Sequence, residues 1–282
     1  MELNNISVIG SGTMGNGIAH VSALSGYNVS LIDSSPSALD KALETINNNL
    51  SRQLSKGIIS DSDAKEALGN ISISSDISQS SQSDLVIEAV PEDFGLKLNI
   101  LKQIDSVVGI DTIIATNTSS ISITKLAEGT KRSDKVIGMH FMNPVPVMKL
   151  VEIIASDHTS DRTHEIVVGV AKSMGKIPVS CKDFPGFVSN RILMPMINEA
   201  IICYEQGVAS ADSIDEIMVL GMSHPMGPLR LADLIGLDIC LNIMNVLYDG
   251  FNDKKYKPSK LLSDMVSSGT LGKKTGEGFY RY

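Results

Sequence analysis

The feature that most constrains this chain is a glycine-rich turn directly after its first apolar run. Residues 6–9 are strand-like, and the segment G-S-G-T-M-G at 10–15 follows and opens a helical pattern. A G-x-G-x-x-G segment between a strand and a helix is typical of dinucleotide-binding β-α-β units. Gly10 allows the tight turn, Gly12 lets the backbone approach a pyrophosphate, and Gly15 permits close contact of helix and strand. A glycine turn that holds no ligand is the alternative.

A carboxylate follows the second strand-like run. Asp33 ends the run 29–32, at the position where dinucleotide folds place an acidic residue. Such a carboxylate accepts hydrogen bonds from the ribose 2′-hydroxyl and repels a 2′-phosphate, so Asp33 favours NAD over NADP. The alternatives are that Asp33 is only a turn residue, or that the hydroxyls of Ser34 and Ser35 tolerate a phosphate.

Short apolar runs alternate with helical patterns up to about residue 180, which predicts an α/β domain with a parallel, doubly wound sheet. The serine-rich stretch 72–83 is interpreted as a surface loop. Strand signals end near Asp183, and the remainder predicts an all-helical domain. We therefore expect a Rossmann-type domain over 1–184 and a helical domain over 185–282. The predicted helices of the second domain cover 187–206, 210–220, 228–248 and 259–267.

Composition excludes several classes of function. Of 282 residues, 43% are hydrophobic and 20% charged, and the net charge of -8 makes nucleic acid an unexpected partner. Neither a signal peptide nor an apolar run of about 18 residues is visible, so we expect no membrane span. The spacing of Cys181, Cys203 and Cys240 fits no metal site, so reduced thiols and a cytoplasmic location are expected.

A histidine and a glutamate lie on two consecutive strand-like runs. His140 ends the run 136–140 and Glu152 lies in the run 150–154, with a short proline-containing loop between them. This loop can bring the two side chains together, and a histidine with a carboxylate partner is an acid–base pair. The polar segment 117–120 also follows a strand and would reach the same edge of the sheet. A buried core histidine at 140, or His224 as the functional histidine, are the alternatives.

The chain resembles the 3-hydroxyacyl-CoA dehydrogenase family over essentially its whole length. The similarity is carried by G-S-G-T-M-G at 10–15, V-I-E-A-V-P-E at 86–92, N-T-S-S at 117–120, H-F-M-N-P-V-P-V-M-K-L-V-E at 140–152, K-D-F-P-G-F-V-S-N-R at 182–191, H-P-M-G-P at 224–228 and G-K-K-T-G-E-G-F-Y at 272–280. The length is similar to that of bacterial short-chain members, which interconvert acetoacetyl-CoA and (S)-3-hydroxybutyryl-CoA with NAD in butyrate and butanol fermentation. The resemblance also implies a homodimer formed through the helical domain.

The resemblance assigns roles to individual residues. It makes His140 the catalytic acid–base and Glu152 its orienting partner, while Ser119 and Asn190 hydrogen-bond the 3-oxygen of the substrate. It places Arg52 and Lys56 against the nucleotide of coenzyme A. It implies that the cofactor is surrounded by Gly10, Gly12, Thr13, Met14, Gly15, Asp33, Glu92, Lys97, Asn143 and Lys274. No metal is required by this chemistry.

Two other functions share parts of the pattern. A β-hydroxyacid dehydrogenase acting on free acids has the glycine turn and a helical second domain, but it is expected to use a lysine as its acid. A NAD-binding structural or redox-sensing protein would not need Ser119, His140, Glu152 and Asn190 together.

Overall fold

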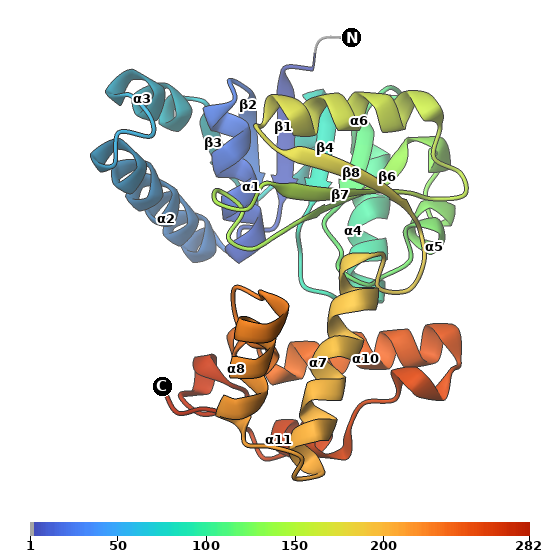
Figure 1. Ribbon diagram of the computed structural model, residues 1–282. Helices are drawn as coiled ribbons and strands as arrows, with labels where there is room; N and C mark the ends of the chain where they lie inside the picture. Colours follow the sequence, from blue (N-terminus) through green and yellow to red (C-terminus); the bar gives the residue numbers. More distant parts are fainter. Residues whose placement is uncertain (1–2) are drawn as a thin grey trace. The chain divides into compact units, whose positions relative to one another are not determined.

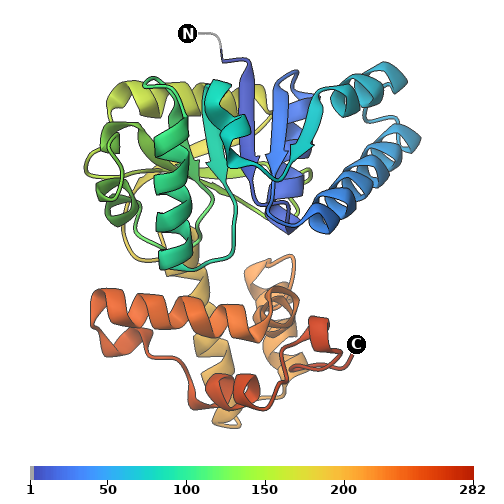
Figure 2. The same cartoon turned by 180° about the vertical axis from the view of Figure 1, so that it is seen from behind.

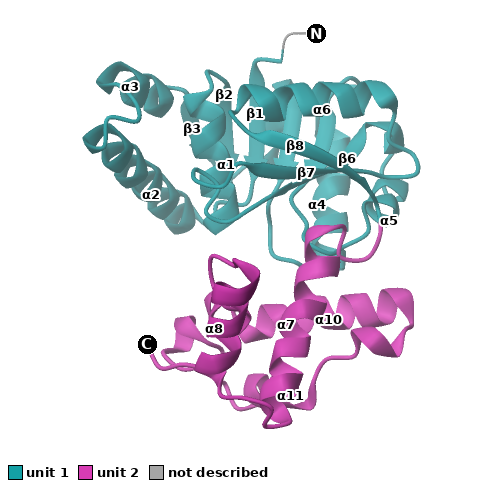
Figure 3. Ribbon diagram, in the orientation of Figure 1, with its two compact units in different colours: residues 1–183 teal, residues 184–282 magenta. Residues whose placement is uncertain are grey.

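The computed structural model describes residues 3–282, and the chain divides into two compact units after Asp183 (Figure 3). The division lies one residue before the boundary expected from the sequence. The first unit is an α/β domain and the second is helical, so the predicted fold class is confirmed. Among the described residues no single helix is long and apolar enough to cross a membrane, although two helices separated by a 98° bend pass that test together.

The first unit is built on one eight-stranded sheet in the order β3-β2-β1-β4-β5-β6-β7-β8. The strands are β1 (Asn5–Ile9), β2 (Asn28–Ile32), β3 (Ile71–Ser74), β4 (Leu85–Glu88), β5 (Ile113–Thr116), β6 (Val136–Phe141), β7 (Leu150–Ala155) and β8 (Ile177–Lys182). The sheet order reverses between β1 and β4, which is the position where doubly wound sheets bind nucleotides. The central strands carry almost continuous apolar runs because helices cover both of their faces.

The sheet is not parallel throughout, which corrects the sequence-based expectation. Strands β1 to β6 run parallel, whereas β7 pairs with β6 in the antiparallel direction and β8 follows the direction of β7. The connection from β6 to β7 is too short for a crossover helix, so the chain can only turn back on itself. As a result, the first residues of β7 lie at the same edge of the sheet as the last residues of β6.

Two layers of helices cover the sheet. Helices α1 and α6 lie on one face in Figure 1, and α4 and α5 lie on the other, as the reverse view in Figure 2 shows. Helices α2 and α3 pack beside α1. Their bounds are α1 (Thr13–Leu24), α2 (Pro36–Ser55), α3 (Asp61–Gly69), α4 (Phe94–Val107), α5 (Ile123–Glu128) and α6 (Asp161–Ser173). Side chains cap most of the helix starts, for example Ser35 at α2 and Asp93 at α4.

The serine-rich stretch 72–83 is more regular than the sequence suggested. Its first residues belong to the edge strand β3, and residues 77–82 form the 3₁₀ helix η1. The prediction of a loop was wrong here because an edge strand gains its order from pairing with β2, which serine-rich composition does not reveal. Asp76 caps η1 by accepting hydrogen bonds from the backbone N–H and hydroxyl of Ser78.

The second unit contains α7 (Ser189–Glu205), α8 (Ala211–Met222), α9 (Pro228–Ile235), α10 (Leu237–Phe251) and α11 (Lys260–Ser267) around one apolar core. The single helix predicted over 228–248 is in fact two helices. Gly236 separates them with a φ of 104°, a conformation that glycine adopts readily and other residues rarely do. The bend lets both helices bury an apolar face in the same core.

The C-terminal residues are attached to this unit by a buried carboxylate. Asp233 accepts hydrogen bonds from the backbone N–H groups of Phe279 and Tyr280 and from the Tyr282 hydroxyl. Burial raises the pKa of Asp233, and these hydrogen bonds oppose the rise. The three hydrogen bonds to Asp233 hold the residues that follow the turn with Lys274. The Lys274 amine pairs with Asp238 at 2.5 Å.

Candidate functional site

The glycine turn has the geometry that a bound pyrophosphate requires. Gly10 has a φ of 100°, and a Cβ there would lie 2.7 Å from the Ala89 carbonyl oxygen. A Cβ at Gly15 would lie 1.7 Å from the carbonyl oxygen of Gly10, so only glycine permits this approach of α1 to the turn. At Gly12 no atom lies within 4 Å of the corresponding position. The backbone at Gly12 is therefore open to a ligand at the N-terminus of α1.

Asp33 is held in place by both of its carboxylate oxygens. One oxygen accepts hydrogen bonds from the backbone N–H and the hydroxyl of Ser11, and the other accepts one from the backbone N–H of Ser35. Burial alone would raise the pKa of Asp33, but these hydrogen bonds outweigh it and lower the pKa below its usual value. Ser11 and Ser35 were not among the predicted site residues. Their only sequence signal is that they lie within the glycine motif and the start of α2.

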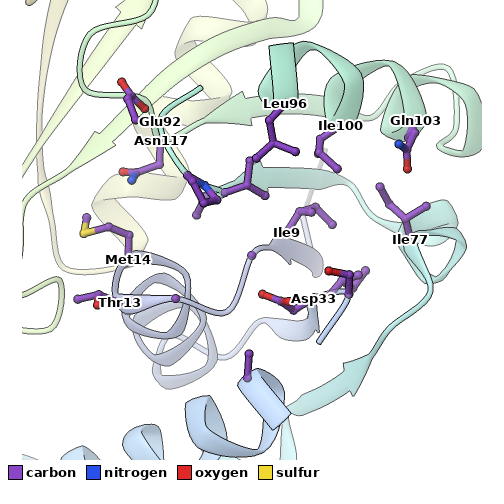
Figure 4. A pocket seen from close by; sticks show the side chains of 18 of the residues that line it. Ile9, Thr13, Met14, Asp33, Ile77, Glu92, Leu96, Ile100, Gln103 and Asn117 are labelled. Atoms are coloured by element: carbon purple, nitrogen blue, oxygen red, sulfur yellow. The ribbon is translucent and has the colours of Figure 1, made fainter. Parts of the chain in front are cut away.

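One cavity of about 810 Å³ connects these features. Thr13 and Met14 lie on one side of it, and Leu96 and Ile100 of α4 lie on the opposite side (Figure 4). Asp33 lies at one end of the cavity, and Glu92 and Asn117 lie at the other (Figure 4). Cavities of roughly this volume hold nucleotide-sized ligands. The open Gly12 backbone, the fixed Asp33 carboxylate and the apolar α4 side chains fit the phosphates, ribose and base of a dinucleotide.

The expected contact between His140 and Glu152 is present. The two residues lie directly opposite each other on β6 and β7, and the His140 Nδ1 atom is 2.8 Å from a Glu152 carboxylate oxygen. Both are buried, at 6% and 4% exposure. A carboxylate at Nδ1 fixes the orientation of the imidazole and directs Nε2 to the other side.

Ser119 occupies that other side. Its hydroxyl lies 3.1 Å from the His140 Nε2 atom, and Ser119 also lines the cavity. The side chains of Ser119 and His140 therefore meet at the edge of the cavity, where β5 and β6 end. An oxygen atom of a ligand placed here would face one hydroxyl group and one imidazole nitrogen, which is a site for proton transfer.

Other predicted residues lie in varied surroundings. Asn143 is exposed in the loop after β6, and Arg52 and Lys56 are exposed at the end of α2. Asn190 is buried at the start of α7 and belongs to the second unit, as does Lys274. Their contacts with cofactor or substrate stay predictions.

The predicted residues Lys97 and Glu92 lie together with Glu88, which was not predicted; Lys97 and Glu88 are buried, whereas the Glu92 side chain is 38% exposed. Lys97 is fully buried, and its amine lies 2.8 Å from Glu88 and 3.6 Å from Glu92. Asn117, which the sequence analysis placed in the polar segment 117–120 without a role of its own, lines the cavity and accepts a hydrogen bond from the Phe141 backbone N–H. Its position as the first residue of N-T-S-S was the available signal.

The other four histidines have different environments. His158 faces Glu128 at 3.6 Å, but both side chains are largely exposed. His20 is buried against Gln53, and burial lowers its pKa. His164 contacts Ser180 near the sheet edge, and His224 follows α8 in the second unit. His140 therefore combines burial, a close carboxylate and a place beside the cavity.

Comparison with known proteins agrees with this geometry. The family model described as "3-hydroxyacyl-CoA dehydrogenase, NAD binding domain" matches residues 5–184. The model described as "3-hydroxyacyl-CoA dehydrogenase, C-terminal domain" matches residues 186–282. Together the two models span both units, with the glycine turn, Ser119, His140 and Glu152 in the first of them.

Individual relatives extend over the same length. The chain is 50% identical to a probable 3-hydroxybutyryl-CoA dehydrogenase of Bacillus subtilis, over 100% of this chain and 98% of the relative. It is 50% identical to a 3-hydroxybutyryl-CoA dehydrogenase of Clostridioides difficile, over 98% of this chain and 99% of the relative. The crystal structure of (S)-3-hydroxybutyryl-CoA dehydrogenase from Ralstonia eutropha matches with a TM-score of 0.97 at 50% identity, covering 100% of this chain and 99% of that one.

Proposed function

Because the chain belongs to the 3-hydroxyacyl-CoA dehydrogenase family and is an NAD-dependent oxidoreductase, we propose that it interconverts acetoacetyl-CoA and (S)-3-hydroxybutyryl-CoA. The names of the relatives support this substrate. The observation that carries the proposal is the buried His140–Glu152 pair with Ser119 at the opposite ring nitrogen. On the strength of the family resemblance, we place the reaction in the cytoplasm, in butyrate- or butanol-type fermentation.

The chain's own residues supply the proton and the orientation. When bound in the cavity, NADH would supply the hydride that the 3-carbon of the acyl group accepts. The 3-oxygen gains negative charge as this occurs, and His140 gives it a proton from Nε2, so that the ketone becomes an alcohol. The Ser119 hydroxyl holds the same oxygen by a hydrogen bond, which stabilises the developing charge. Glu152 stays at Nδ1, fixes the ring and stabilises the positive charge of the imidazolium.

The direct test is a spectrophotometric assay with purified protein. We expect NADH absorbance to fall when acetoacetyl-CoA is added and to fall far less with free acetoacetate. NADPH should support a lower kcat/KM than NADH, because the Asp33 carboxylate repels a 2′-phosphate. Turnover of free acid in preference to the thioester, or a preference for NADPH, would contradict the proposal.

The proposal includes a homodimer formed through the helical unit. Helix α8 exposes Ile217, Leu220 and Met222, and the Leu220 side chain is 81% exposed. Ile217 also lines an apolar cavity of about 390 Å³ bordered by α7 and α8. Exposed apolar surface next to an apolar hollow is typical of a face that is covered in an oligomer.

Substituting Leu220 tests this assembly. We expect Leu220→Glu to convert the dimer to a monomer, because it places two carboxylates in a desolvated symmetric interface. Sedimentation velocity or light scattering measures the mass. Ile110→Glu, an equally exposed apolar position on the first unit, should leave the dimer intact. A monomeric wild type at micromolar concentration would refute the assembly.

A further inference from the structure

The amine of Lys97 lies behind the turn that carries Ser119. The Lys97 side chain is completely buried, and Nζ donates hydrogen bonds to Glu88 at 2.8 Å and to the Val90 carbonyl at 3.1 Å. Burying a charge is costly unless it is paired, and Glu88 provides the pairing. The other Glu88 oxygen accepts a hydrogen bond from Thr116. The ammonium is therefore fixed in position at the carboxyl ends of β4 and β5.

Glu92 connects this ammonium to the catalytic serine. Its Oε2 atom lies 3.6 Å from Lys97 Nζ. Its Oε1 atom accepts four hydrogen bonds, from the Thr118 hydroxyl at 2.6 Å, the Ser119 N–H at 2.9 Å, and the Ser120 N–H and hydroxyl, both at 3.0 Å. Two successive backbone N–H groups and two hydroxyls thus converge on one carboxylate oxygen. This arrangement sets the backbone of the turn on both sides of the Ser119 side chain.

We propose that Glu92 and Lys97 are positioning residues that act on the reaction through Ser119. Glu92 folds the 118–120 turn so that the Ser119 hydroxyl meets His140 Nε2, and Lys97 holds the second oxygen of Glu92 from inside the domain. This inference rests on the proposed function, because it assigns Ser119 its place in that chemistry. Lys97 has no exposed side-chain surface, whereas the Glu92 side chain is 38% exposed and borders the cavity, so the test measures NADH binding separately from turnover.

The kinetic test is a double-mutant cycle on Glu92 and Ser119. We expect Glu92→Ala to lower kcat by about 10² fold, since a misplacement near 1 Å costs that much. In a Ser119→Ala background, Glu92→Ala should lower kcat less than about threefold. The Ser119 hydroxyl, through which Glu92 acts, is already absent there. The Kd for NADH, from fluorescence, should change less than about threefold. Additive losses, or a raised Kd with unchanged kcat, would overturn the proposal.

Lys97 needs a variant that keeps the domain folded. Lys97→Met alone leaves Glu88 buried without its partner, so the test uses Glu88→Gln/Lys97→Met, which removes both charges together. We expect a loss of kcat with an unchanged Kd for NADH, as for Glu92→Ala. Lys102→Met, an exposed lysine on the same helix, is the matched control and should behave like wild type.

Hydrogen exchange separates this inference from the proposed function. Amide protons of residues 118–121 should exchange at least about tenfold faster in Glu92→Ala than in wild type, because Glu92 accepts two of them. Ser119→Ala, which keeps the backbone hydrogen bonds, should not show this. Unchanged exchange in Glu92→Ala would refute the positioning role even in an active enzyme. Absence of turnover in the wild type would instead refute the proposed function, and the exchange data would still decide the role of Glu92.

Discussion

Replacement of His140 by alanine is expected to lower turnover of acetoacetyl-CoA by about 10²–10⁴ fold, the usual contribution of a positioned acid–base group. The variant lacks the nitrogen that lies 3.1 Å from the Ser119 hydroxyl and thus the proton donor for the 3-oxygen. The dinucleotide cavity is formed by other side chains, so NADH should bind with nearly its wild-type Kd. Steady-state kinetics at saturating NADH, with a separate binding titration, measures both quantities.

A second histidine provides the control for this experiment. His158 also faces a carboxylate, that of Glu128, but the pair is exposed. His158→Ala should therefore retain wild-type turnover. Equal losses in the two variants would indicate a general effect on the fold, and full activity of His140→Ala with NADH bound would remove His140 from the mechanism.

Substitution of Arg132 is expected to have the largest effect on stability. Its guanidinium pairs with Asp105 at 2.6 Å and donates to the carbonyls of Val108, Gly109 and Thr112 just beyond the end of α4. Both side chains of the pair are more than 90% buried. Arg132→Met leaves a buried carboxylate without its partner and several carbonyl groups without donors. We expect the free energy of unfolding of the first unit to fall by about 3–5 kcal/mol.

Urea unfolding followed by NADH fluorescence and circular dichroism measures this loss. The exposed pair of Lys65 and Asp61 is the matched control, and Lys65→Met should leave the free energy of unfolding nearly unchanged. Arg132→Met/Asp105→Leu removes both charges and should recover much of the stability. A loss below about 1 kcal/mol in Arg132→Met would show that the buried pair does not hold the end of α4.

Local sequence was sufficient for the parts of the site whose geometry is local. The turn at 10–15 has the conformation that its glycines predict, since Gly10 and Gly15 each permit a backbone approach that a Cβ would block, and Gly12 leaves its surroundings open. The contact between His140 and Glu152 was also predictable. The short connection between their strands forces an antiparallel pairing, and the register places the two residues opposite each other.

Contacts between distant segments were not predictable in the same way. Glu92 reaches Ser119 and Ser120 across more than 20 residues, because β4 and β5 are neighbours in the sheet and their ends carry both segments to one place. The division of the predicted helix 228–248 at Gly236 likewise follows from the shape of the core that both halves must cover.

The sequence by itself therefore determined the dinucleotide turn, the division into an α/β part and a helical part, and the histidine–carboxylate pair, because each depends on residues close together along the chain. Only the tertiary structure decided which side chains contact the turn that carries Ser119. Strand order and register bring Lys97, Glu92 and Ser119 together, and no pattern of spacing along the chain encodes that contact.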